Sequence, residues 1–162
     1  MKKMIFAAVA LGVVTSSAFA TDIDPSSITT VPATVTVAAP ANITASFKPI
    51  IIPSGPQAAW TDVGVLTVTS TDGSVVAAQG DVTAPDYSDQ YNSWTTTGTN
   101  DTNHKIKLAV STNDSISYGY HGTSHIWRLY SSGTPIKIQL ASDQEVAADS
   151  YTFKLFAAKL LN

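Results

Sequence analysis

Apolar and polar residues alternate with a period of two along most of the chain, and this pattern limits the fold more than any other feature. The alternation is clearest in residues 105–110 (KIKLAV) and 136–140 (IKIQL). Successive side chains of a β-strand point to opposite faces, so each such segment has one buried and one solvated face. After the first twenty residues no segment shows an apolar stripe at helical spacing. The sequence therefore predicts an all-β protein.

Eight segments carry the strand pattern: residues 31–39, 42–47, 63–69, 74–78, 105–110, 125–130, 135–141 and 151–161. Asp72-Gly73 and Ser132-Gly133 suit tight hairpins between them. Short strands at this spacing predict a sandwich of two sheets, and 162 residues fit a single core. Residues 84–103, rich in Asp, Asn, Thr and Gly, are expected to form a long exposed loop or an irregular hairpin.

The first twenty residues have the features of a secretory signal. Lys2 and Lys3 form a basic start, residues 4–14 are apolar, and Ala18-Phe19-Ala20 (residues 18–20) fits the small-x-small pattern of a cleavage site. The apolar run is much shorter than the roughly 20 residues that span a bilayer. We therefore expect cleavage before Thr21 and export of the remaining chain. An exported domain with no Cys has no disulfide, so its stability must come from other interactions.

Composition and motifs exclude several kinds of function. A formal net charge of -3 argues against a nucleic-acid partner, because binding phosphates requires a basic surface. His104, His121 and His125 do not lie in an HExxH motif, and Ser124 does not lie in a G-x-S-x-G motif. The sequence therefore predicts no catalytic residue, no metal site, no cofactor and no enzymatic activity. A secreted enzyme or inhibitor on a β-sandwich remains an open alternative.

Residues 30–39 (TVPATVTVAA) form an unusual first strand. Val31, Ala33, Val35, Val37 and Ala39 share one face, and the other face is mostly Thr. The segment is uncharged, small in its side chains and preceded by a polar leader. Two interpretations follow: the segment inserts into a groove of another molecule, or it is an ordinary first strand of its own sandwich.

Aromatic residues within polar sequence are the candidate contacts for a receptor. Tyr87, Tyr91 and Trp94 lie in the expected loop at 84–103, where exposed aromatic rings can stack on sugars or anchor protein contacts. The alternative is that these rings hold their own loop against the sandwich. Trp60 and Trp127 each border a predicted strand, so we expect them in the core or in a groove.

Four motifs occur in a defined order along the chain. The alternating Thr/Val/Ala segment is followed by residues 39–47 (APANITASF), residues 63–68 (VGVLTV) and, near the end, residues 147–153 (AADSYTF). This order resembles the subunits of chaperone–usher fimbriae, in particular the Cys-free branch with the plague capsular antigen and thin enteric fimbriae. Asp149-Ser150 stands where that family often has Gly before Tyr. Between residues 80 and 133 the match is only to generic β sequence.

The resemblance implies an immunoglobulin-like β-sandwich that is incomplete because its last strand is missing. In the family, a periplasmic chaperone fills the resulting groove with a strand of its own. At the outer-membrane usher, the N-terminal segment of the next subunit replaces that strand, which gives a head-to-tail homopolymer of identical subunits. For this chain the resemblance implies a signal peptide at 1–20, a donor strand within 21–39 and a pilin domain at 40–162.

The resemblance also implies site residues. The donor face comprises Thr29, Val31, Ala33, Val35, Val37 and Ala39. The groove and chaperone contacts are expected on the last strand, from Tyr151, Phe153 and Leu155 on one face or from Phe156 and Leu160 on the other. The sequence leaves this choice open, because residues 156–161 are apolar on both faces.

The expected function is that of a structural subunit of a surface fimbria or capsule-like fibre, without enzymatic activity. Such a subunit is exported through the periplasm to the bacterial cell surface and mediates adhesion to host cells through a receptor or glycan. The alternative is a self-contained secreted module that binds a carbohydrate or receptor, such as a tip adhesin.

Overall fold

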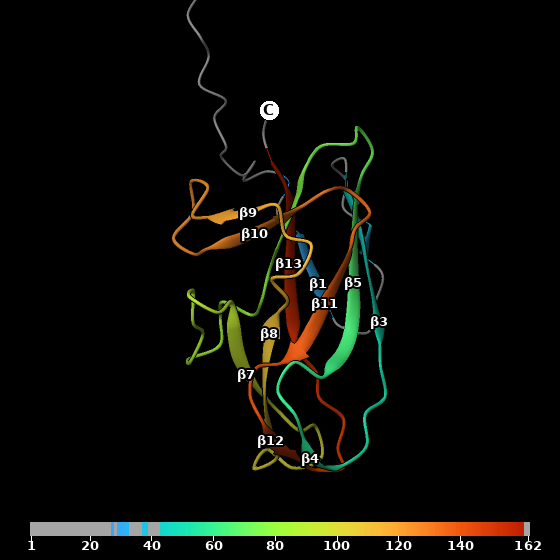
Figure 1. Ribbon diagram of the computed structural model, residues 1–162, viewed down its shortest axis with the longest axis vertical. Coiled ribbons are helices and arrows are strands. Elements are labelled where there is room, and N and C mark those ends of the chain that lie inside the picture. The colour runs from blue at the N-terminus through green and yellow to red at the C-terminus, as the bar shows by residue number, and fades with distance from the viewer. Residues whose placement is uncertain (1–26, 28, 33–36, 39–42, 161–162) are drawn as a thin grey trace, which may run out of the picture.

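The computed structural model describes residues 27, 29–32, 37–38 and 43–160, and these form two facing antiparallel sheets (Figure 1). In these residues one sheet has the order β1 (Thr29–Pro32), β13 (Lys154–Lys159), β6 (Val76–Gln79), β10 (Trp127–Tyr130) and β9 (Ser117–Gly119). The expected signal peptide lies outside the described residues. No helix in the described part of the chain has the length and apolar character to cross a membrane.

The second sheet has the order β2 (Val37–Ala38), β3 (Ile43–Pro49), β5 (Asp62–Ser70), β11 (Pro135–Leu140), β8 (Lys105–Val110) and β7 (Ser93–Thr97). A small ribbon of β4 (Gly55–Gln57) and β12 (Gln144–Val146) lies at one end of the sandwich (Figure 1). The all-β, immunoglobulin-like architecture expected from the sequence is confirmed.

The core lies between the two sheets and is built from the inward faces of alternating strands. Ile136, Ile138 and Leu140 of β11 are fully buried, whereas Pro135 and Lys137 are exposed, as the period of two predicts. From the facing sheet, Tyr130 and Leu155 enter the same cluster. This packing supplies the apolar burial that a domain without disulfides needs.

Residues 84–103 were expected to form a long exposed loop or an irregular hairpin, and residues 93–97 show that the first of these is wrong. They form β7, which pairs with β8 and places Trp94 in the core at 1% exposure. The Thr96 hydroxyl donates to the Thr152 carbonyl over 2.7 Å, so this Thr is buried with its polar group satisfied. Apolar alternation does not identify a strand of this kind.

Two glycines allow large rings to cross the sheets. A Cβ on Gly64 of β5 would lie 2.1 Å from Cζ of Phe47, and a Cβ on Gly80 would lie 2.2 Å from Cε3 of Trp94. Any side chain at either position would displace a packed ring. Gly64 therefore determines where the Phe47 ring lies, at the edge of the core beside the last strand.

The carboxylate of Asp149 joins the loop at 98–104 to the start of the last strand. It accepts hydrogen bonds from the backbone N–H groups of Asn100 (3.0 Å), Asp101 (3.0 Å) and Ser150 (2.7 Å), and lies 3.0 Å from Nδ1 of His104. Its side chain is fully enclosed, at 0% exposure. The Asn100 N–H and the other donors, working against desolvation, hold the pKa of Asp149 well below its usual range.

We expect Asp149→Asn to lower the thermal midpoint at neutral pH, because the amide cannot accept all of these hydrogen bonds. The lowered pKa of the folded carboxyl means that its stabilisation is present above the unfolded pKa of about 4 and is lost as the pH falls toward the folded value. The difference in midpoint between wild type and Asp149→Asn should therefore shrink on acidification below about pH 4. Thermal unfolding followed by circular dichroism across pH 2–7 measures this.

Glu145→Gln is the matched control, since Glu145 is an exposed carboxylate for which the structure shows no hydrogen bond to another described residue. Its midpoint should follow wild type at every pH. A constant gap between wild type and Asp149→Asn from neutral to acidic pH would contradict the assigned role of the charge.

Candidate functional site

The N-terminal segment pairs with the last strand of the same chain. β1 runs antiparallel to β13, with Thr29 opposite Ala157, Val31 opposite Leu155 and Pro32 opposite Lys154, and the two strands lie side by side in Figure 1. Just before β1, the Ser27 hydroxyl donates to the Lys159 carbonyl (3.2 Å) and accepts from the Lys159 N–H (3.1 Å). The edge of the five-stranded sheet is therefore formed by residues from the segment expected to act as a donor.

This pairing is short. β1 has four residues and ends at Pro32, which has no N–H to continue the ladder. The segment reappears as β2, where Val37 pairs with Ala45 and Ala38 with Thr44 in the opposite sheet. Residues of one segment thus border both sheets. In the described part of the chain, no strand extends the register of β1 toward Phe153 and Tyr151.

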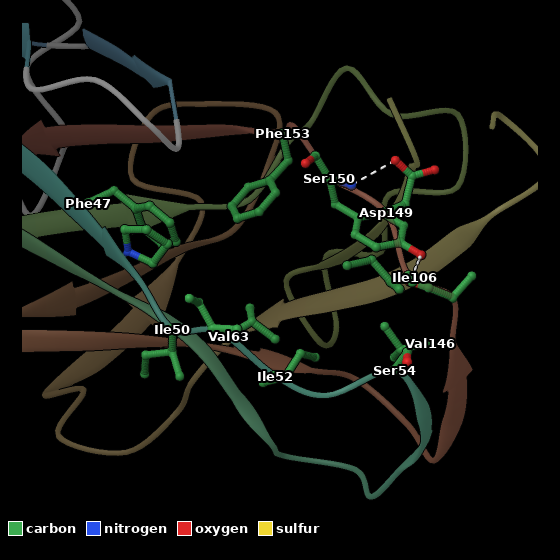
Figure 2. Close-up of a pocket in the computed structure, with 15 residues that line it drawn as sticks. Phe47, Ile50, Ile52, Ser54, Val63, Ile106, Val146, Asp149, Ser150 and Phe153 are labelled. Atoms are coloured by element: carbon green, nitrogen blue, oxygen red, sulfur yellow. Dashed lines mark hydrogen bonds between the residues drawn. The ribbon is translucent and has the colours of Figure 1, made fainter. Parts of the chain in front are cut away.

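An apolar cavity of about 480 Å³ opens at this end of the seam between the sheets (Figure 2). Its apolar walls come from the end of β3, the loop at 50–54, β5, β8, the end of β12 and the approach to β13: Phe47, Ile52, Val63, Ile106, Val146 and Phe153. Ser54, Asp149 and Ser150 also line it. The rings of Phe47 and Phe153 meet edge to face, with centroids 5.5 Å apart. The cavity is open to solvent and its volume is in the range of about 300–1,000 Å³ typical of ligand sites, so it can receive an apolar side chain.

The structure separates the two faces of the last strand that the sequence left open. Leu155 is fully buried in the core, Phe153 is 8% exposed and lines the cavity, and Tyr151 is half-buried and lines it too. The Tyr151 hydroxyl donates to the Ala147 carbonyl over 3.0 Å. The face that carries Tyr151, Phe153 and Leu155 therefore points between the sheets.

The alternative face, with Phe156 and Leu160, does not point toward the cavity. Both side chains pack against a second apolar cluster that contains Trp127 and Leu129, on the other side of the five-stranded sheet. Alternation along β13 sends Phe156 to the face opposite Leu155, so of the two alternatives the face with Tyr151, Phe153 and Leu155 is the one beside the cavity, and a chaperone contact of Phe156 and Leu160 stays a prediction.

Sequence reasoning missed the cavity walls outside the last strand, above all Phe47, Ile52 and Val63. One signal was available. Residues 50–52 are three consecutive Ile between prolines in an expected loop, and Ile51 is 97% exposed while Ile50 is 40% exposed. An apolar run in an exposed loop is typical of a contact surface.

Of the expected donor residues, Thr29 and Val31 lie in β1 and Val37 lies in β2. Ala33, Val35 and Ala39 lie outside the described residues. The backbone of the segment therefore reaches both the last strand and β3.

The candidate receptor contacts have different environments. Trp94 is buried and packs on Phe153 with ring centroids 5.8 Å apart, so its expected exposure is wrong. Tyr87 is half-buried, edge-on to the His125 ring at 5.3 Å, and burial raises its pKa. Tyr91 is 56% exposed. The three residues do not form one surface patch, because β7 turns Trp94 inward.

The two other tryptophans also differ from each other. Trp127 is 2% exposed, as expected of a core residue, but Trp60 is 58% exposed. Of the two placements expected for Trp60, core or groove, the core is wrong, because β5 begins at Asp62 and Trp60 lies in the turn before it. Its side chain instead lines a surface cavity beside Gln139.

Two of the histidines lie close to carboxylates. His104 lies near Asp149 and Asp101, and His125 lies 3.4 Å from Asp89. Among the described residues, no three His, Asp or Glu side chains gather as a metal site.

Comparison by sequence finds no matching protein-family model and no significant match among curated proteins. Comparison by structure finds fimbrial and pilus subunits. The minor tip subunit HdaB of the Escherichia coli Hda pilus superimposes with a TM-score of 0.61 at 10% identity, covering 75% of this chain and 85% of that one. The Salmonella SafD adhesin gives 0.59 at 16% identity, covering 73% and 84%.

AggB, the minor subunit of aggregative adherence fimbriae type I from Escherichia coli, gives a TM-score of 0.57 at 12% identity, covering 75% of this chain and 86% of that one. At these identities the likeness concerns the fold. The fold expected from the resemblance is thus confirmed: the chain has the immunoglobulin-like β-sandwich of chaperone–usher fimbrial subunits.

Proposed function

We propose that the chain is a structural subunit of a chaperone–usher surface fimbria or capsule-like fibre, and that it polymerises by donor-strand exchange. One observation carries the proposal. The pairing of β1 with β13 ends at Pro32, and the apolar cavity lies beside the residues that come next along the line of the last strand.

The register of β1 indicates what a longer donor strand would meet. Continued past Pro32, it places Ala33 opposite Phe153 and Val35 opposite Tyr151, and both partners line the cavity. Within one chain this continuation competes with β2, because Val37 pairs with Ala45 of the opposite sheet only five residues after Pro32. The segment of a neighbouring copy has no such tether, so it can follow the last strand through Ala39.

Energetics favour the exchanged form. Burying each additional Val side chain contributes about 1.5–3 kcal/mol to the stability of the junction. Each added hydrogen bond of the strand ladder contributes about 0.5–1.5 kcal/mol more. These gains come only when the cavity is filled and the ladder extended.

Because each copy gives its segment to the next, the contact is head-to-tail and does not close, which generates a linear fibre.

Before assembly, a subunit needs protection of the apolar cavity between its sheets and of the strand edge beside it. An unpaired strand edge beside exposed Ile50 and Ile51 promotes aggregation. A periplasmic chaperone that supplies a strand, and an outer-membrane usher where that strand is replaced, would meet this need. We accordingly propose export through the periplasm to the bacterial cell surface, with residues 1–20 as the signal and 21–39 as the donor region.

Adhesion to host cells is the proposed role of the fibre, because one structurally similar protein is an adhesin. Tyr91 stays a candidate receptor contact on grounds of exposure, with the half-buried Tyr87 nearby in the chain. The fold and the paired histidines provide no argument for an enzyme.

A second candidate is a self-contained tip adhesin. The pairing of β1 with β13 inside one chain favours it, since that strand completes the sheet edge without a neighbour. One structurally similar protein is a minor tip subunit. The two candidates differ in which molecule supplies the strand beside Leu155.

Engineered cysteines can determine which molecule supplies that strand, because the native sequence has none. Val31→Cys and Leu155→Cys place thiols on directly opposed residues, whose Cα separation of about 4.5–5.5 Å suits a disulfide. We expect the double variant, assembled with its chaperone and usher and then oxidised, to give a ladder of covalent multimers on non-reducing gels.

Thr44→Cys with Thr69→Cys is the matched control, since these exposed residues are opposed within β3 and β5 of one chain. This pair should yield cross-linked monomers only. If Val31→Cys with Leu155→Cys also yields only monomers, the strand comes from the same chain and the tip-adhesin candidate is favoured.

Val35→Asp tests the filling of the cavity. In the extended register Val35 lies opposite Tyr151, so the substitution places a carboxylate against apolar walls and forfeits about 1.5–3 kcal/mol of Val burial. We expect few fibres by electron microscopy and a lower melting temperature for those that form. Thr34→Asp, on the alternate face of the segment, introduces the same charge and should assemble far better. Equal assembly of the two variants would argue against the proposed register.

A further inference from the structure

Trp60 has an unusual backbone conformation. Its φ is 66°, in the left-handed region. The other described residues with positive φ, glycine aside, are Asn92, Asp114 and His121, which are types that tolerate this region. A bulky aromatic residue there is strained, and Trp60 is also 58% exposed, so burial of the ring does not compensate for the strain.

The conformation belongs to a turn. The N–H of Thr61 donates to the Ala58 carbonyl over 3.3 Å, which puts Trp60 at the third position of a four-residue turn. A positive φ at this position is normally supplied by Gly or Asn. The geometry of the turn therefore does not explain why this position holds a Trp.

Neighbouring elements hold the turn in place from several sides. The Trp60 N–H donates to the Leu140 carbonyl (2.8 Å), and the Trp60 carbonyl accepts from Nε2 of Gln139 (3.0 Å). Asp143 accepts from the N–H of Ala59 over 2.7 Å. The strained backbone is thus fixed by its surroundings, so the indole is presented to solvent from a rigid support.

A cavity of about 320 Å³ lies beside the indole. It is lined by Trp60, Ser111, Thr112, Asn113 and Gln139, all of them uncharged. It shares no lining residue with the seam cavity. Its volume is in the range of small-molecule sites, about 300–1,000 Å³.

The polar groups around this cavity are neutral and partly free to bind. Nε2 of Gln139 is engaged by the Trp60 carbonyl and by Oδ1 of Asp62 (2.7 Å), which leaves the amide oxygen as an acceptor. Asp62 is itself neutralised by Lys137, with Nζ and Oδ2 2.8 Å apart. Within the described residues, the side chains of Thr112 and Asn113 make no hydrogen bond.

We propose that this cavity, with Trp60 as its platform, binds a neutral sugar. A pyranose ring has an apolar C–H face that packs on an indole plane, and a hydroxyl edge that both donates and accepts hydrogen bonds. The hydroxyl of Thr112 and the amides of Asn113 and Gln139 match that edge, and the uncharged lining disfavours an ionic ligand. The site is separate from strand exchange, so it does not depend on how the subunit assembles.

Titration of the purified chain with galactose, glucose, N-acetylglucosamine and lactose, followed by ¹⁵N–¹H NMR, tests the proposal. The chain has three Trp residues, and Trp94 and Trp127 are buried at 1% and 2% exposure, so their indole signals are internal references. We expect at least one sugar to shift the Trp60 indole signal in a saturable way and to leave the other two unchanged. Absence of a saturable shift with all four sugars overturns the proposal.

Three variants separate a binding role from a structural one. Trp60→Ala should weaken sugar binding by about tenfold or more, measured on backbone signals of Thr112 and Asn113. Trp60→Gly should lose binding equally but keep or raise the thermal midpoint, because Gly adopts the positive φ without strain. Tyr120→Ala removes another exposed ring, 56% exposed, and should bind as wild type does.

Unchanged binding in Trp60→Ala would overturn the site. A fall in the thermal midpoint of Trp60→Gly as large as that of Trp60→Ala, with no loss of binding, would assign Trp60 a structural role only. Each variant is also assembled into fibres, so that a defect of strand exchange is recognised separately from a defect of sugar binding.

Discussion

The last strand needs a neighbour along its outer edge, and the rest of the molecule depends on how that need is met. β13 and the residue before it bring Leu155 and Phe153 into the core from one sheet, while β3 and β5 close the core from the other. Where β1 lies beside β13 the seam is covered, and where β1 stops a cavity with apolar walls begins. The sandwich is complete only where a strand pairs with the outer edge of β13, and no disulfide takes the place of that pairing.

Much of the fold follows from the sequence, because alternation with a period of two is a direct consequence of strand geometry. It predicted segments that overlap β3, β5, β8 and β11 and the burial of their inward residues. It failed for β7, which has Ser and Thr at four of its five positions and buries Thr96 through a hydrogen bond to the Thr152 carbonyl rather than through apolar contact. Trp94 was misplaced for the same reason.

The candidate site could be predicted only in part. The sequence named Tyr151, Phe153 and Leu155 but could not choose between the two apolar faces of the last strand, since that choice depends on which sheet lies opposite. Phe47, Ile52 and Val63 come from three different parts of the chain and meet only in the folded sandwich. The exposure of Trp60 depends on a turn held by Gln139 and Leu140, which are remote in sequence.

The placement of β1 and β2 in opposite sheets has a consequence for cooperativity. The two strands belong to one segment and border β13 and β3, respectively. Removal of that segment would therefore uncover an edge of each sheet in a single event, instead of loosening one sheet at a time. If the segment leaves, the outer edges of β13 and β3 therefore become accessible together, and a partner that protects one edge but not the other would leave the molecule half covered.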